Sequence, residues 1–294
     1  MNDINTLTSV GYRIEDKESL RAVAPAAFAS DHHPDRTKRY SYVNTEELVD
    51  TLTQSGWDLF SAKQNGANPF SRHIIRFNNS KLGYFDLKGD KVKPQVILDN
   101  SHNGGSQAQI WAGLFRLVCS NGLVVAMPGL YTNIILKHVG INKEELLKTL
   151  TLISDQYAVV GSHINDMIQV DLDKKTAFEF AMKAIAIREP HTFINADGTV
   201  NTKKVLTSTN INQVLTPLRG EDKGENLWSI FNLVQEKMVN GGVERTSFGN
   251  NRRSVTKGIV NAARNIEYNR QLWTLAESFM PQTAPEPLAL VSSN

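Results

Sequence analysis

The first half of the chain contains three short runs of β-prone residues, and their spacing limits the folds that it can adopt. The runs are residues 57–63, 71–78 and 93–99, and Asn, Gly and Pro separate them. Runs of this length with turn residues between them are typical of antiparallel strands. A helix is expected just before them, because Asn44 is a good N-cap and Gly56 can end the helix. This order predicts a small antiparallel sheet with a packed helix.

The segment that follows, DNSHNGGSQAQIWAGLFRLVCSNG, is the most distinctive part of the sequence and covers residues 99–122. We expect a glycine-rich turn and then a helix that is capped by Ser106 and ends at Asn121 and Gly122. Such a helix would place Arg116 on its polar side, away from the core. An alternative is that Arg116 forms a buried ion pair, with Asp99 as the candidate partner.

The second half is predicted to be largely helical. Helices are expected over residues 142–168, 173–189, 227–240 and 254–279, where capping residues precede apolar stripes. On the last helix Arg253, Lys257 and Arg264 would form a basic outer stripe. The fold class is therefore α+β. We expect one domain over residues 1–280, sheet-rich at about 36–135 and helical at about 136–280, and then a disordered tail at 281–294.

The composition predicts a globular cytoplasmic protein. Hydrophobic residues make up 40% of the 294 residues, which suffices for a core. We find neither a run of about 20 apolar residues that would span a membrane nor the features of a signal peptide. The single cysteine, Cys119, excludes an intrachain disulfide. The seven histidines never recur four residues apart with a carboxylate between them, so no metal or other cofactor is expected.

Positive charge is concentrated in two stretches, although the net charge is only +2. Residues 61–120 contain eight lysines and arginines and three aspartates, a local charge of +5. A second basic stretch begins at Arg245 and continues through Arg252, Arg253, Lys257, Arg264 and Arg270. Because phosphate groups are recognised mainly by lysine and arginine, these stretches predict an anionic partner.

Several blocks of the sequence resemble a known family. The blocks TKRYSYVNTEELVDTLTQSGW, SRHIIRF, LDNSHNGGSQAQIWAGLFRLVCSNGLVV and LWSIFNLVQEKMVNGG, with the closing NRQLW, are similar to the phage and plasmid family known as domain of unknown function 932. The resemblance implies a bacterial host cell and a role in replication, recombination or defence of mobile elements. One departure is Asn103, where Asp is expected to be commoner. The predicted topology is also similar to the core of the Rad52-type single-strand annealing proteins.

These observations favour a non-catalytic protein that binds single-stranded DNA, of the annealing or recombination type. The candidate nucleic-acid-binding residues are Arg39, Arg72, His73, Arg76, His102, Arg116, Arg252, Arg253, Lys257 and Arg264. They would neutralise phosphates, while Tyr40 and Tyr42 would be available to stack on bases. On the strand, Arg72 and Arg76 are expected to share the more polar face.

Each feature also has a structural interpretation. Basic side chains are usually part of a solvated surface, and a histidine such as His102 is more often satisfied by hydrogen bonds than catalytic. Two other functions remain open. One is a protein-interaction module that acts on a host factor, for example against a defence system. The other is a hydrolase or nuclease centred on His102. A homo-oligomer is also compatible with the sequence.

Overall fold

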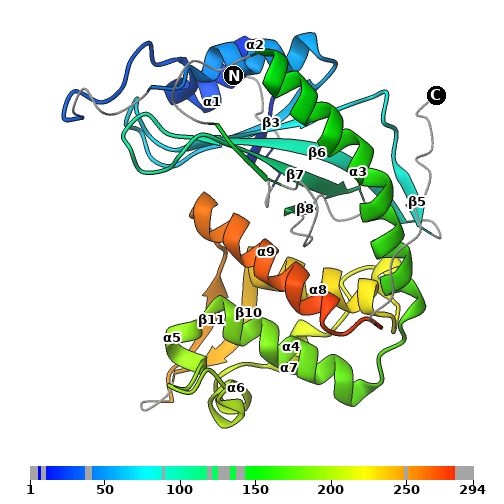
Figure 1. Cartoon of the computed structure of the whole chain (residues 1–294). Coiled ribbons are helices and arrows are strands. Elements are labelled where there is room, and N and C mark those ends of the chain that lie inside the picture. The colour runs from blue at the N-terminus through cyan, green and yellow to red at the C-terminus, as the bar shows by residue number, and fades with distance from the viewer. Residues whose placement is uncertain are drawn as a thin grey trace. The chain divides into compact units, whose positions relative to one another are not determined.

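The structure is a computed structural model that describes residues 6–7, 11–36, 42–87, 90–117, 121–124, 133–136, 143–247 and 251–281. Within these ranges the chain forms two compact units (Figure 1). Unit 1 ends at Val160, and unit 2 begins at Gly161. The sheet belongs to unit 1, and most of the helices belong to unit 2.

Unit 1 is built around a nine-stranded antiparallel sheet. Its strands are β1 (Thr6–Leu7), β2 (Gly11–Arg13), β3 (Asp58–Gln64), β4 (His73–Asn78), β5 (Phe85–Leu87), β6 (Asp90–Asn100), β7 (Gln109–Arg116), β8 (Asn121–Val124) and β9 (Asn133–Ile135). The strand order is β1-β2-β3-β4-β6-β7-β8, while β5 pairs with β6 and β9 pairs with β7. The three predicted strands correspond to β3, β4 and β6, so the antiparallel sheet is confirmed with more strands than predicted.

Helices α1 (Lys17–Val23) and α2 (Thr45–Gln54) lie over one face of this sheet, with the short helix η1 (Pro25–Phe28) between them in the chain (Figure 1). The predicted cap of α2 is confirmed, because the Asn44 side chain accepts hydrogen bonds from the backbone N–H groups of Glu46 and Glu47. The buried side of α2 carries leucine and valine, and these apolar side chains form its contact with the core. α2 therefore fixes its first residue, Thr45, above the sheet.

The segment after residue 99 forms strand β7 and not the predicted helix. β6 and β7 form a hairpin in which Asp99 lies opposite Gln109. Every residue from Ile110 to Arg116 is buried, so the strand is covered on both faces. A continuous apolar run suits a strand of this kind, and its periodicity cannot be distinguished from that of a buried helix. The prediction of a helix with Arg116 on its polar side was therefore wrong.

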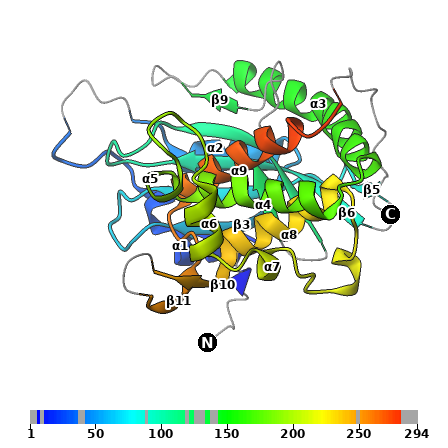
Figure 2. The ribbon, with the colours of Figure 1, turned by 90° about the horizontal axis from the view of Figure 1, so that it is seen from below.

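Unit 2 is mostly helical, as predicted. It contains α4 (Lys174–Arg188), α5 (Pro190–Phe193), α6 (Thr202–Ser208), α7 (Ile211–Val214), η2 (Gly220–Asp222), α8 (Leu227–Asn240) and α9 (Ala262–Glu277), and α3 (Lys143–Gln169) ends in it. Helices α4, α8 and α9 pack side by side (Figure 2). Phe180, Phe231 and Trp273 are buried in their core. The α+β fold class is confirmed.

The last predicted helix is divided between a strand and a shorter helix. Residues 254–257 belong to β11 (Arg253–Lys257), which pairs with β10 (Gly241–Thr246), and α9 begins only at Ala262 with Asn261 as its cap. The wheel pattern was misleading because β11 is largely exposed and is followed by a turn at Gly258. A Cβ at Gly258 would lie 3.0 Å from the Asn240 carbonyl oxygen, so this turn favours glycine. Arg253 and Lys257 thus lie on the hairpin, and Arg264 lies on α9.

Some predictions concern residues that the structure does not describe. Arg39, Tyr40 and Cys119 lie outside the described residues, and so does the predicted tail apart from Pro281. In the parts of the chain that are described, no helix is both long enough and apolar enough to cross a membrane.

Candidate anion-binding surfaces

Two of the predicted basic residues of unit 1 form ion pairs that are partly or fully buried. Arg72 donates through Nε to Asp99 Oδ1 at 2.7 Å and through Nη2 to Asp99 Oδ2. Arg116 donates through Nε to Asp90 Oδ2 at 2.6 Å and is 2% exposed. Arg116 therefore does not point away from the core, and its partner is Asp90 and not Asp99. Both pairs join neighbouring segments of the sheet and neutralise the two guanidinium groups.

The two predicted histidines lie in a buried polar cluster at the start of α2. Thr45 Oγ1 lies 2.9 Å from His73 Nε2 and 3.2 Å from His102 Nε2. Asn100 also donates to this hydroxyl, at 2.9 Å. His73 Nδ1 lies 2.9 Å from the Ser71 carbonyl, so Nδ1 carries the proton and Nε2 accepts one from Thr45. We call these four residues, Thr45, His73, Asn100 and His102, the Thr45 cluster.

The Thr45 cluster holds both histidines in the neutral form. Burial lowers the pKa of His73 to about 3, and burial likewise lowers the pKa of His102 to about 4. All four residues of the cluster are almost completely buried. Tyr42 packs its ring 4.9 Å from that of His102 and donates its hydroxyl to the Ala29 carbonyl. Thr45 therefore contacts one ring nitrogen of His102, Nε2, while the other, Nδ1, is buried without a hydrogen-bond partner among the described residues.

Arg76 is placed differently from the other basic residues of the sheet. It is 4% exposed, and its guanidinium lies 3.4 Å from Gln95 Oε1. Lys63 on β3 lies on the same face of the sheet as Arg76. Arg76 is the cross-strand partner of Ser61, and residues two apart on a strand, such as Ser61 and Lys63, point to the same face. Burial lowers the pKa of Arg76 to about 10. Burial, and then the charge of Arg76, lower the pKa of Lys63.

The C-terminal basic residues gather on one part of unit 2. A pocket of about 530 Å³ lies between the β10–β11 hairpin, α5 and the start of α9. Its charged lining residues are Arg188, Arg245, Lys257 and Arg264 with one carboxylate, Glu189. Arg245 pairs with Glu189 at 2.6 Å, and the charge of Glu189 also acts on Arg188, so Lys257 and Arg264 are the cations that have no acidic partner in this lining.

The backbone around this pocket holds its arginines in place. Arg264 Nη2 donates to the Arg188 carbonyl at 2.8 Å, and Arg188 Nη2 donates to the Lys257 carbonyl. The Asn261 side chain caps α9 by accepting from the Arg264 backbone N–H at 3.0 Å. The pocket therefore lies at the positive end of a helix dipole as well as among cations.

A second pocket of about 700 Å³ adjoins the first one, since both are lined by Arg245, Ser254 and Val255. Arg253 lines this second pocket and is exposed. Neither Arg253 nor Lys257 has a carboxylate partner among the described residues. We define the hairpin surface as Arg188, Arg245, Arg252, Arg253, Lys257 and Arg264. The structure thus brings Arg253, Lys257 and Arg264 together, although on a hairpin and a helix and not on one helix face.

Sequence reasoning missed two members of the hairpin surface. Arg188 ends α4 two residues before Pro190, and nothing in its local pattern relates it to residues beyond 240. Arg245 was recognised as part of a basic stretch but not as a binding residue. Its side chain lies in both pockets, because β10 pairs with β11 next to Ser254. Only the tertiary fold brings these residues together.

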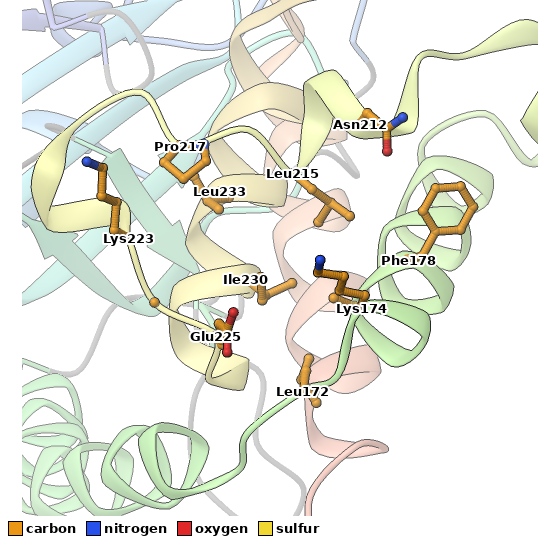
Figure 3. A pocket seen from close by; sticks show the side chains of 12 residues that line it. Leu172, Lys174, Phe178, Asn212, Leu215, Pro217, Lys223, Glu225, Ile230 and Leu233 are labelled. Carbon is orange, nitrogen blue, oxygen red and sulfur yellow. The ribbon is translucent and has the colours of Figure 1, made fainter.

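A third pocket in unit 2 is mainly apolar. It has a volume of about 680 Å³ and lies among α4, α7 and α8 (Figure 3). Leu172, Phe178, Leu215 and Leu233 line it, and its charged residues are Lys174, Lys223 and Glu225. Among the described residues no group of three or more His, Cys, Asp or Glu side chains has a geometry that would hold a metal ion.

Comparison with known proteins gives related sequences and a family. The chain is 29% identical to the UPF0380 protein YafZ of Escherichia coli K12 and 28% identical to the UPF0380 protein YfjQ of the same strain. Each similarity extends over 274 residues, which is 90% of this chain and 92% of the relative. No solved structure matches. The model of the family described as "Domain of unknown function (DUF932)" matches residues 32–273, and the chain therefore belongs to this family.

Proposed function

We propose that this protein binds single-stranded nucleic acid without a reaction, and that the hairpin surface of unit 2 contacts the phosphates. The observation that carries the proposal is that Arg253, Lys257 and Arg264 lie around two adjoining pockets and pair with no carboxylate among the described residues. Exposed cations of this kind attract a phosphate backbone and release its counterions on binding. Glu189 forms its ion pair with Arg245.

The hairpin surface fits a single strand better than a duplex because apolar side chains lie among its cations. Val255 is 61% exposed and Val260 is 72% exposed, and both line the pocket that contains Lys257. In a duplex the faces of the bases are stacked on one another, whereas in a single strand they are free to pack on such side chains. Phosphate contact by the arginines and apolar contact by the valines would not read a base sequence.

The proposal assigns the basic residues of the sheet to other roles. Arg72 and Arg116 are neutralised by aspartates, and His73 and His102 belong to the buried Thr45 cluster. Binding of a nucleic-acid strand at the hairpin surface would therefore depend on its six cations, Arg188, Arg245, Arg252, Arg253, Lys257 and Arg264. A cytoplasmic role in annealing or recombination of phage or plasmid DNA, and a homo-oligomer, are finer parts of the proposal. Their support is the resemblance of the sequence blocks. The likeness of the predicted topology to annealing proteins does not support them, because the packed helix that it required is strand β7.

The test measures binding of a labelled single-stranded oligonucleotide by fluorescence anisotropy. One variant replaces Arg252, Arg253 and Lys257 by Gln, and a matched control replaces Lys148, Lys183 and Arg270 by Gln. The control residues are also cations on the surface, and each lies within 3.2 Å of a glutamate on its own helix. We expect the hairpin variant to lose about tenfold or more in affinity and the control to retain it. Equal loss in both variants would refute a specific role of the hairpin surface.

A second candidate function is binding of a protein, for example a host factor. The apolar pocket of Figure 3 favours it, because its lining combines Leu and Phe side chains with two lysines and one glutamate. A partner with an apolar side chain next to a carboxylate would satisfy both parts of this lining. Replacing Leu215 by Asp should then abolish capture of the partner by the full-length protein and leave binding of the oligonucleotide unchanged.

A further inference from the structure

The sheet of unit 1 has an excess of positive charge on the face that carries Arg76. Residues that alternate along β3 and β4 share this face, and they include Lys63, Arg72 and Arg76. Gln95 and Asp99 on β6 also lie on this face. Each is two residues from Ile97, which is the cross-strand partner of Arg76. We call this group of five residues the Arg76 face. It contains three cations and one carboxylate, so its formal charge is +2.

The carboxylate of the Arg76 face is already occupied. Both oxygens of Asp99 accept hydrogen bonds from Arg72. Neither Lys63 nor Arg76 has an ion-pair partner among the described residues. The Arg76 guanidinium donates through Nη1 to Gln95 Oε1, at 3.4 Å. The amide nitrogen of Gln95 donates to Asn78 Oδ1 at 2.8 Å, which leaves its oxygen on the side of Arg76.

Burying the charge of Arg76 without an anion nearby costs free energy of folding. Removing a charge from water costs several kcal/mol unless an opposite charge or several hydrogen bonds replace the water, and one long hydrogen bond to a neutral amide replaces little. A second cation close to the first one increases the cost. Lys63 is only partly buried, so an anion from solvent can reach the pair from its side.

We propose that Lys63 and Arg76 form a binding site for a phosphate group that carries two negative charges, such as inorganic phosphate or a phosphate monoester. The guanidinium of Arg76 can donate two parallel hydrogen bonds to such a group, and Lys63 adds a point charge. A dianion matches the formal charge of +2, whereas a carboxylate or a phosphodiester would leave half of it uncompensated. This site lies in unit 1 and does not depend on nucleic-acid binding by the hairpin surface.

The test is a calorimetric titration of the full-length protein with inorganic phosphate, in chloride buffer of constant ionic strength. We expect saturable binding by the wild type and at least about tenfold weaker binding by Lys63→Met and by Arg76→Met, since each variant loses one charged contact. The variant with Gln at Arg252, Arg253 and Lys257 should bind phosphate like the wild type. No saturable binding by the wild type, or unchanged binding by Lys63→Met, would overturn the proposal.

The stability of unit 1 in the absence of phosphate shows whether Arg76 belongs to a ligand site or has a structural role. If the site is built for an anion, Arg76→Met removes an uncompensated buried charge and leaves unit 1 as stable as the wild type or more stable. If Arg76 is structural, the same variant loses stability with and without phosphate, and the proposal is wrong. Competition by a 5′-phosphorylated oligonucleotide, but not by its unphosphorylated form, would identify a strand end as the source of the phosphate. Competition by neither would identify a free phosphate compound.

Discussion

The arginines of two regions, the sheet of unit 1 and the hairpin surface of unit 2, lie in different surroundings. In unit 1, Arg72 and Arg116 are paired with aspartates inside the sheet, and two neutral histidines surround a buried hydroxyl. In unit 2, Arg253 and Lys257 are exposed on a hairpin, and neither pairs with a carboxylate in the described part of the chain. Buried charges are expensive to separate and thus hold a fold together, whereas exposed ones cost little and remain available to a ligand. Residues of the same type therefore have different roles in the two units.

The largest effect is expected from breaking the buried ion pair of the sheet. Arg72→Met leaves the fully buried Asp99 carboxylate without its partner and should lower the free energy of unfolding of unit 1 by about 3–5 kcal/mol. The control is Arg270→Met, which breaks an exposed pair with Glu267 on α9 and should cost less than about 1 kcal/mol. Hydrogen exchange of the β4 and β6 amides measures the change in the free energy of unfolding for Arg72→Met. Exchange of the α9 amides measures it for Arg270→Met. Similar costs for both would remove the contrast between the units.

The next effect concerns the Thr45 cluster. Thr45→Val keeps the shape of the side chain but removes the partner of His73 Nε2 and of one N–H of Asn100, whose other N–H still donates to the Val43 carbonyl. We expect a loss of about 2–4 kcal/mol in the free energy of unfolding of unit 1, since each unsatisfied buried group costs about 1–3 kcal/mol. Thr53→Val, on the exposed side of the same helix, is the matched control and should change little. If Thr45→Val were as mild as the control, the cluster would not stabilise the fold.

The same cluster predicts a dependence on pH. The pKa of His73 is lowered to about 3 and that of His102 to about 4 in the folded protein, so below about pH 6.5 the unfolded chain binds protons that the folded chain does not. The stability of unit 1 is therefore complete above that pH and falls as the pH decreases toward 4. The slope is at most about 1.4 kcal/mol per pH unit for each histidine. His73→Gln should make hydrogen exchange in β4 and β6 less sensitive to pH, and an unchanged slope would contradict this assignment. His191→Gln, at an exposed position, should leave the slope as it is.

The smallest effect on stability is expected at the hairpin surface. Replacing Arg252, Arg253 and Lys257 by Gln removes three exposed charges and should change the free energy of unfolding of unit 2 by less than about 0.5 kcal/mol for each residue. Hydrogen exchange of α4, α8 and α9 amides gives this value. A large loss would mean that these cations hold the hairpin in place, and the contrast with unit 1 would then disappear.

Local sequence signals predicted much of the fold and little of the candidate site. The caps Asn44 and Asp173 predicted the starts of α2 and α4, because capping depends on residues within one turn. β7 was missed because a strand buried on both faces has no polar alternation. The partner of Arg116 was missed for a related reason, since the pairing of β6 with β7 decides which aspartate it meets. Arg188 and Arg245 join the hairpin surface through contacts between distant segments, which no local pattern records.

The salt dependence of oligonucleotide binding shows whether the exposed cations of the hairpin surface neutralise phosphates. For a single strand, the slope of log K against log salt decreases by about 0.7 for each phosphate contact that is lost. The account predicts a steep slope for the wild type and for the Lys148, Lys183 and Arg270 control, and a slope lower by about 2 for the variant with Gln at Arg252, Arg253 and Lys257. The same slope in all three proteins would contradict the claim that the exposed cations of the hairpin surface neutralise phosphates.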